Sequence, residues 1–152
     1  MKRFATLLTL AFAIACSVQA QTTEDSVKAT INRLFEGMKN ADTTLLKLAF
    51  GDTPILQTIA TNKKGAIYIR SDKYGDFVKF ISQQKPGEAD ERIEFETIRI
   101  DGPLAMAWTP YQFFYKGKFR HCGVNSFQLV RLDGEWKIQY LIDTRRKNCD
   151  SQ

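Results

Sequence analysis

The sequence predicts an α+β domain in which N-terminal helices pack on one face of an antiparallel sheet. Two observations indicate this class. Apolar residues in the first half recur at the spacing of one helical face, whereas the second half alternates apolar and polar residues between short turns that contain glycine. Helices that precede a run of consecutive strands are typical of α+β folds.

The first 20 residues are predicted to be a signal peptide and take no part in the fold. Lys2 and Arg3 give a positive start, residues 4–15 are apolar, and a small-residue pattern suited to cleavage ends at Ala20. The apolar run is shorter than the roughly 20 residues that cross a bilayer. We therefore expect residues 21–152 to form one exported domain, periplasmic or secreted. The alternative is lipid attachment at Cys16, which ends a loose lipoprotein-type cleavage sequence.

Composition disfavours several classes of function. Without Lys2 and Arg3, 20 basic residues stand against 17 acidic ones, a net charge of +3. The basic residues are scattered except for the triplet at 145–147, and no aromatic and basic patch of the nucleic-acid-binding kind is present. One histidine and no close cysteine pair offer almost nothing for a structural zinc site. No cofactor is predicted.

Three helices are predicted in the first half. The first follows the capping candidates of residues 22–26 and ends near Asn40, and Asp42 is placed to cap the second. The third begins after Ser71 or Asp72 and ends at the Lys-Pro-Gly sequence of residues 85–87. Two short strands, 54–61 and 66–71, precede it. The predicted inward positions of the first and third helices are Val27, Ile31, Leu34, Phe35, Met38, Phe77, Val78, Phe80 and Ile81.

The second half is predicted to be a four-stranded meander of residues 92–100, 104–115, 118–132 and 135–144. Turns at Asp101-Gly102, Lys116-Gly117 and Asp133-Gly134 join the strands, and an acid-glycine pair is a strong signal for a hairpin. Counting from these turns fixes a register. It predicts an outward face with Glu94, Glu96, Gln128, Lys137, Gln139 and Asp143, and an inward face with Ile93, Phe95, Met106, Trp108, Phe114, Phe119, Phe127, Leu129, Ile138, Tyr140 and Ile142.

A polar cluster is predicted within the inward face. Trp108 pairs with Asn125, Gln112 with His121, and Phe127 with Tyr140 in this register. A concave apolar surface with a few convergent polar groups is the usual form of a small-molecule site. The predicted pocket therefore consists of Trp108, Gln112, His121, Asn125 and Tyr140, with Arg70 at its mouth.

Each pocket residue has a functional and a structural interpretation. His121 is a general base if another group orients it, with Asn125 and Tyr140 as donors to an oxyanion, or it stands at the wet rim bonded to Gln112. Asn125 binds a ligand or a structural partner. Trp108 and Tyr140 are ligand platforms or core residues. Arg70 holds an anion or is a solvated strand end.

Cys122 and Cys149 remain after the predicted cleavage, in a compartment that permits disulfides. The predicted register sets Cys122 opposite Arg145, so that Cys149 lies four residues past the partner position. Four extended residues span roughly 13 Å, more than a disulfide tolerates. The two cysteines therefore pair only if the C-terminal tail folds back, and both outcomes stay open.

The order of elements resembles the nuclear transport factor 2-like superfamily. Asn40-Ala41-Asp42 followed by Leu45, Leu48 and Phe50, and then the run from Phe127 to Ile138, are similar to its SnoaL-like and lumazine-binding-like branches. The resemblance covers nearly all of residues 21–152. It implies a cone-shaped fold in which helices and a curved sheet enclose an internal pocket.

The superfamily contains ketosteroid isomerases, scytalone dehydratases, epoxide hydrolases and polyketide cyclases beside many non-catalytic binders. This chain departs from the isomerase pattern. Leu34 stands near the position of the oxyanion tyrosine, Thr58 near that of the aspartate base, and Asn125 near that of the second oxyanion acid. The dehydratase uses a pair of histidines, whereas this sequence has only His121.

Three functions are compatible with the sequence. The first is an exported, non-catalytic domain that binds a small, flat, largely apolar ligand, and the absence of a carboxylate from the predicted pocket favours it. The second is an acid–base enzyme, a lyase, isomerase or hydrolase, centred on His121. The third is a structural dimerisation module, a homodimer through the outer sheet face, with Tyr111, Tyr115, Val124 and Leu141 as contributors.

Overall fold

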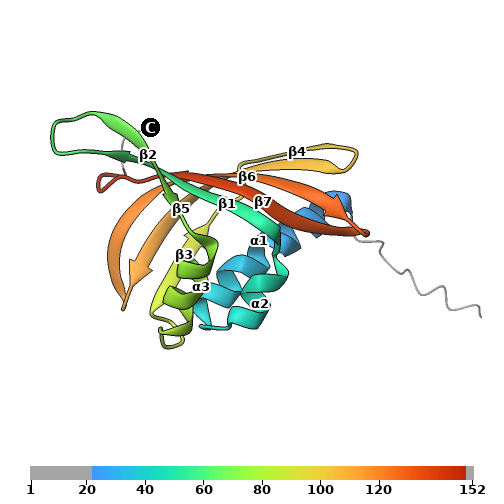
Figure 1. Ribbon diagram of the computed structural model, residues 1–152, viewed down its shortest axis with the longest axis horizontal. Coiled ribbons are helices and arrows are strands. Elements are labelled where there is room, and N and C mark those ends of the chain that lie inside the picture. Colours follow the sequence, from blue (N-terminus) through green and yellow to red (C-terminus); the bar gives the residue numbers. More distant parts are fainter. Residues whose placement is uncertain (1–21, 150–152) are drawn as a thin grey trace, which may run out of the picture.

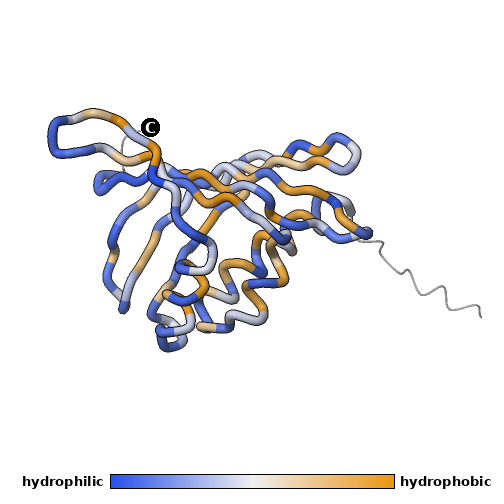
Figure 2. Tube along the Cα trace, viewed as in Figure 1, coloured by the Kyte–Doolittle hydropathy of each residue, from blue (hydrophilic) through white to orange (hydrophobic). Residues whose placement is uncertain are grey.

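A computed structural model describes residues 22–149, in which three helices lie against one side of a curved sheet (Figure 1). Apolar segments of the helices face the sheet (Figure 2). The predicted signal peptide and Cys16 lie outside the described residues, so export and lipid attachment stay predictions.

The first helix, α1 (Thr23–Lys39), starts four residues earlier than its apolar stripe because of a capping box. The Thr22 hydroxyl accepts a hydrogen bond from the Asp25 backbone N–H at 3.1 Å, and the Asp25 carboxylate accepts in return from Thr22. The short α2 (Thr43–Leu48) is capped by Asp42, as predicted. The third helix, α3 (Tyr74–Ser82), has only Lys73 at its N-cap, without a side-chain bond, so the predicted caps Ser71 and Asp72 are wrong.

Seven strands form one mixed sheet in the order β2-β1-β7-β6-β5-β3, with β4 also paired to β5. Their bounds are β1 (Phe50–Thr61), β2 (Ile67–Asp72), β3 (Ala89–Ile93), β4 (Thr97–Asp101), β5 (Leu104–Tyr115), β6 (Lys118–Leu132) and β7 (Glu135–Thr144). The sheet is not purely antiparallel, because β1 runs parallel to β7. This pairing places the first hairpin beside the last strand.

The predicted strand 92–100 is two strands, and Pro110 supplies a reason. Ile93 pairs with Tyr111 and Thr97 with Trp108. Residues 94–96 therefore lie opposite the part of β5 that contains Pro110. Pro110 has no N–H to donate to a ladder, although its carbonyl still accepts from Glu94. The chain therefore leaves regular pairing here and resumes it as β4.

Two β-bulges change the predicted register. One lies where β5 pairs Phe113 with His121 but Phe114 with Phe119, and the other where β6 pairs Gln128 with Tyr140 but Leu129 with Ile138. The extra residues are Arg120 and Gln139. Pairs between a turn and a bulge, such as Phe114 with Phe119, agree with the prediction, whereas the pairs beyond the bulges are displaced by one residue.

This displacement reverses the faces of β5 and of the second half of β7, since neighbouring residues of a strand point to opposite faces. Asn125 pairs with Thr109 instead of Trp108, His121 with Phe113 instead of Gln112, and Phe127 with Leu141 instead of Tyr140. The buried core then consists of Ala105, Ala107, Phe127, Leu129, Trp136 and Ile138 of the sheet, packed on Val27, Ile31, Leu34 and Phe35 of α1.

The C-terminal tail folds back over β6. Cys122 and Arg146 exchange backbone hydrogen bonds of 2.9 and 2.7 Å. The predicted partner of Cys122 was Arg145, so this pairing too is displaced by one residue. Cys122 and Cys149 form a disulfide across a Cα–Cα distance of 6.1 Å. The bend after Arg146 removes the separation that an extended tail would have.

Candidate functional site

A cavity of about 580 Å³ lies between the helices and the concave face of the sheet. Residues of α1, α3 and six strands form its walls. The apolar walls include Leu34, Phe35, Met38, Phe77, Phe113 and Leu141, and the polar ones include Thr58, Arg70, Glu91, His121, Asn125, Asp143 and Arg145.

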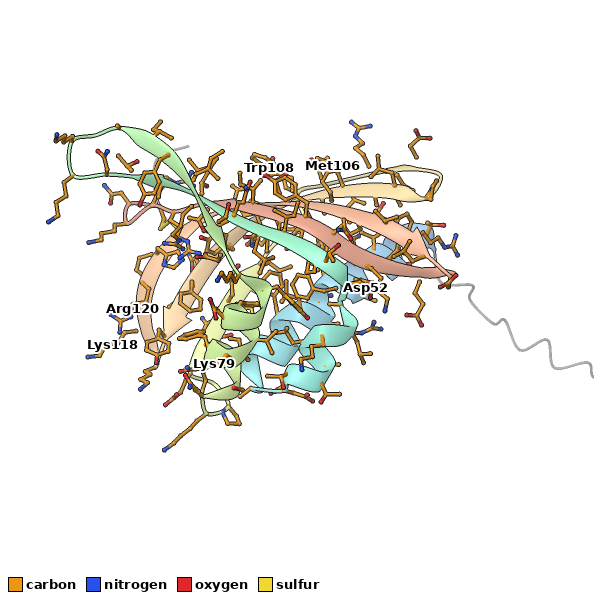
Figure 3. All side chains as sticks on the ribbon, in the orientation of Figure 1. Asp52, Lys79, Met106, Trp108, Lys118 and Arg120 are labelled. Carbon is orange, nitrogen blue, oxygen red and sulfur yellow. A yellow bond between two sulfur atoms is a disulfide. The ribbon has the colours of Figure 1, made fainter. Side chains whose placement is uncertain are left out.

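The structure brings together three of the six predicted pocket residues. His121, Asn125 and Arg70 line the cavity. Trp108 is 40% exposed and lies with Met106 on the side of the sheet away from the helices (Figure 3). The Tyr140 hydroxyl donates to Gln57 Oε1 at 2.7 Å in the β1–β7 pair, outside the cavity lining. Gln112 lines a separate depression beside the disulfide.

The predicted pocket positions of Trp108, Gln112 and Tyr140 are therefore wrong. The cause is the pair of bulges at Arg120 and Gln139, because the one-residue displacement turns these three side chains to the opposite face of the sheet. His121 and Asn125 keep their predicted face because the prediction had the correct alternation within β6.

Four carboxyl groups line the cavity, contrary to the prediction that it holds none; those of Asp72 and Asp76 are exposed, whereas the other two are buried or half-buried. The first is Asp143, expected on the outer face and found 7% exposed on the inner one. Its Oδ1 accepts from the Thr58 hydroxyl, and its Oδ2 accepts from the Tyr111 hydroxyl at 2.9 Å and from Arg145 Nε at 2.8 Å. Burial, and the nearby charge of Asp143, raise the pKa of Tyr111, which therefore stays protonated as a donor.

The second of these two carboxyl groups is Glu91 of β3. Asn125 Nδ2 donates to its Oε1 at 2.8 Å, which gives Asn125 the structural partner that one interpretation required. Burial raises the pKa of Glu91 to about 7, against the opposing effect of the Asn125 bond, and the charge of Asp143 adds to the rise. Glu91 therefore exchanges a proton near neutral pH while it faces the cavity.

His121 lies between two aromatic rings in the same wall. Its ring centroid is 5.7 Å from that of Tyr111 and 5.1 Å from that of Phe113. Burial and the charge of Arg145 lower its pKa, so the imidazole is neutral at physiological pH. Within residues 22–149 its nitrogens make no hydrogen bond, and the expected bond to Gln112 is absent because Gln112 points elsewhere. His121 is thus open to a ligand.

Sequence reasoning did not single out Glu91 or Arg145 as site residues, placed Asp143 on the outer face, and named Thr58 only as standing near the position of the isomerase base. A signal for Glu91 existed, because Ala89, Glu91 and Ile93 occupy every second position of one strand and therefore share a face. The prediction began this strand at Arg92 and so left Glu91 out. Asp143 and Arg145 had none, because the bulge at Gln139 decides their face. Thr58 comes beside Asp143 through the parallel pairing of β1 and β7, which no local pattern indicates.

Replacing Glu91 by Gln should remove a pH dependence of stability. The ordinary pKa of this side chain is 4.5 and the folded value is about 7. The folded protein therefore binds the proton more tightly, and this stabilisation is complete below pH 4.5 and lost as pH rises through 7. We expect the wild type to lose about 2–3 kcal/mol over this range relative to E91Q.

Urea unfolding at pH 5 and pH 8 measures this effect. E91Q should match the wild type at pH 5 and exceed it at pH 8. E96Q, which alters an exposed carboxyl group in the next segment of the chain, is the matched control and should follow the wild type. Parallel curves for E91Q and the wild type across this range would contradict the prediction.

Within the described residues, no group of three or more His, Cys, Asp or Glu side chains is arranged to hold a metal ion. None of the helices in the described part of the chain is long and apolar enough to cross a membrane.

Comparison with known families identifies the family to which this chain belongs. A family profile described as "Putative lumazine-binding" matches residues 22–140, which is most of the chain. The protein belongs to this family. The resemblance inferred from the sequence to the nuclear transport factor 2-like superfamily is confirmed, and so is the α+β fold with helices on a curved sheet. No curated protein is significantly similar in sequence.

Solved structures share the fold at low sequence identity. A nuclear transport factor 2-like protein of unknown function from Shewanella baltica is 15% identical, covers 82% of this chain and 94% of its own, and has a TM-score of 0.66. A domain of unknown function with a cystatin-like fold from Nostoc punctiforme is 15% identical, with coverages of 85% and 82% and a TM-score of 0.63. A nuclear transport factor 2-like protein from Cytophaga hutchinsonii is 14% identical, with coverages of 82% and 99% and a TM-score of 0.63. These likenesses concern the fold alone.

Proposed function

We propose that this protein binds a small molecule with a flat, largely apolar body in the cavity between its helices and sheet. The main support for this proposal is the cavity itself. Its volume of about 580 Å³ lies within the range of roughly 300–1,000 Å³ that is typical of small-molecule sites. A domain that used these residues only as core would fill the space, because protein interiors are close-packed.

The distribution of side chains supports such a ligand. Phe35 and Phe77 provide apolar surface from the helices, whereas Asn125, His121 and Glu91 provide polar groups from the sheet. The family description refers to lumazine, which is a flat bicyclic heterocycle with polar edges. A ligand of that shape contacts the apolar walls with its faces and the polar groups with its edge.

Native mass spectrometry of the protein purified from its own host tests the proposal. We expect a co-purified molecule of a few hundred daltons, released on denaturation. N-phenyl-1-naphthylamine, a flat apolar dye, should also bind the emptied protein and be displaced by the recovered molecule. A protein of unliganded mass that does not bind the dye would refute the proposed function.

Acid–base catalysis is the second candidate, and a specific observation favours it. The cavity holds Glu91, with its pKa of about 7, and the neutral His121 in one wall, whereas the sequence argument against catalysis assumed that no carboxylate was present. A group that titrates near the working pH is suited to proton transfer. Turnover of a co-purified molecule should then disappear in both H121A and E91Q. Turnover that persists in H121A would rule out a reaction centred on His121.

Dimerisation through the outer sheet face is the third candidate. Of the residues expected there, Tyr111 and Val124 are buried and Leu141 lines the cavity, so that expectation is wrong for these three. Other apolar side chains of the sheet are exposed, among them Ile55 at 52% and Trp108 at 40%. Sedimentation velocity of the wild type and W108D separates the cases. A dimer that dissociates in W108D supports this function, whereas a monomeric wild type refutes it.

Export is part of the same proposal. Lys2, Arg3 and the apolar run of residues 4–15 support a signal peptide, and the Cys122–Cys149 disulfide suits an oxidising compartment. The intact mass of the protein from its host decides between an N-terminus at Gln21, a lipid-bearing Cys16 and an uncleaved chain.

A further inference from the structure

Arg145 stands in the cavity wall with part of its guanidinium already fixed. Its Nε donates to Asp143 Oδ2 at 2.8 Å, and Asp143 is itself held by the hydroxyls of Thr58 and Tyr111. A carboxylate bound by three donors is an immobile anchor. The direction of the Arg145 side chain is therefore set by the sheet rather than by solvent.

The two terminal nitrogens of Arg145 are not used by this anchor. Within residues 22–149, neither Nη atom makes a hydrogen bond or ion pair. The side chain is 41% exposed and belongs to the cavity lining. A guanidinium fork with two open donor groups is the arrangement that binds carboxylates and similar anions.

Two ion pairs involve the arginines of this wall and leave the Nη donors of Arg145 unused within residues 22–149. Arg145 Nε is paired with Asp143, and Arg70 is paired with Asp72 at 3.0 Å. Lys73 and Asp76, also in the lining, come from the N-cap and the first turn of α3. Glu91 is largely protonated below pH 7, and the charge of Arg145 reaches His121, whose pKa it lowers.

Arg70 lies on the other side of the hydrogen-bonded pair of Thr58 and Asp143. Its Nη2 is 3.4 Å from the Thr58 hydroxyl, which in turn donates to Asp143. Thr58 thus separates two arginines that both line the cavity. An anionic group at the Nη atoms of Arg145 therefore has a second guanidinium in the same lining, and each of the two guanidinium groups is also paired with an aspartate.

We propose that Arg145 is the anion-binding residue of this cavity and that its ligand is an amphipathic acid. The ligand places a carboxylate or sulfonate against the open nitrogens of Arg145 and its apolar body against the aromatic side chains of Phe35, Phe77 and Phe113. This inference rests on the proposed small-molecule function and specifies its ligand class.

Two dyes with the same aromatic body test it. 1-Anilinonaphthalene-8-sulfonate carries a sulfonate, whereas N-phenyl-1-naphthylamine does not. In R145Q the affinity for the sulfonate dye should fall about tenfold or more, while that for the neutral dye stays within about twofold of the wild type. R145K, which keeps the charge, should restore much of the sulfonate affinity.

R120Q is the matched control, because it removes one positive charge from an exposed position of β6 next to His121 in sequence. It should leave both affinities unchanged. Equal losses for the two dyes in R145Q, or a loss in R120Q as large as in R145Q, would overturn the role of Arg145 while leaving the binding function intact. Failure of both dyes to bind the wild type would instead refute the proposed function.

A measurement on the wild type covers the case in which R145Q does not fold. Raising NaCl from 50 to 500 mM should weaken binding of the sulfonate dye severalfold and leave the neutral dye unaffected, because salt screens an ion pair in a solvent-accessible cavity. Salt-independent binding of the sulfonate dye contradicts the proposal even without a variant.

Discussion

Replacing Leu141 by Trp is expected to abolish binding of N-phenyl-1-naphthylamine and of any co-purified molecule. Leu141 of β7 lines the cavity beside the polar group of Asp143 and is only partly buried. The larger side chain therefore extends into open space instead of compressing packed neighbours. The occupied volume is lost to a ligand, and we expect the affinity to fall by at least about 2–3 kcal/mol, more than tenfold.

Leu132→Trp is the control for L141W. Leu132 is 45% exposed at the end of β6, far in sequence from the cavity residues of that strand, and does not line the cavity. Dye titration should give wild-type affinity for L132W, and urea unfolding should show both variants folded. If L141W folds and binds the dye like the wild type, the dye does not occupy this cavity.

The site could be predicted only as far as local patterns determine strand faces. His121, Asn125 and Phe127 are separated by even numbers of positions in β6, and no bulge interrupts this part of the strand. Their shared inward face therefore followed from the sequence. Trp108 and Tyr140 were assigned by counting across turns, and that count fails wherever a strand contains an extra residue. The bulges at Arg120 and Gln139 depend on how strands twist around the helices, which residue type alone does not reveal.

The fold itself is more predictable because it depends on features that tolerate such errors. The turn at Asp133-Gly134 joins β6 to β7 as expected, and Asp133 and Gly134 both have positive φ. The apolar stripe of α1 places Ile31 and Leu34 against the sheet whatever the register of the strands. The parallel pairing of β1 with β7 had no counterpart in the prediction, because a contact between residues 85 positions apart leaves no local pattern.

The corrected faces also change which chemistry the cavity supports. A pocket of His121 and Asn125 alone had no acidic partner, and the sequence therefore favoured a passive binder. Glu91 and Asp143 now lie in the same lining, one able to exchange a proton near neutral pH and the other held by three donors. The two carboxyl groups thus differ in chemistry, since Glu91 has a raised pKa and one amide donor, whereas Asp143 accepts hydrogen bonds from Thr58, Tyr111 and Arg145.

Gly123→Ala is expected to be strongly destabilising, because the end of β7 lies directly against Gly123. A Cβ atom at this position would overlap the Thr144 carbonyl oxygen, lie 2.7 Å from its carbonyl carbon and contact the Tyr111 ring at 3.0 Å. The obstructing atoms are backbone, so they cannot rotate aside as a flexible side chain does. We expect a loss of at least about 3 kcal/mol in the free energy of unfolding.

Gly75→Ala is the matched control, since nothing lies within 4 Å of a Cβ atom at that position in α3. It should be neutral or stabilising by about 0.5–1 kcal/mol, because alanine is the better helix former. Urea unfolding compares the two variants. A G123A midpoint equal to that of the wild type would mean that β7 can move away from β6 without cost. Such a movement would separate Tyr111 from Asp143 and Thr144, so the same variant should then bind the neutral dye like the wild type but bind the sulfonate dye more weakly.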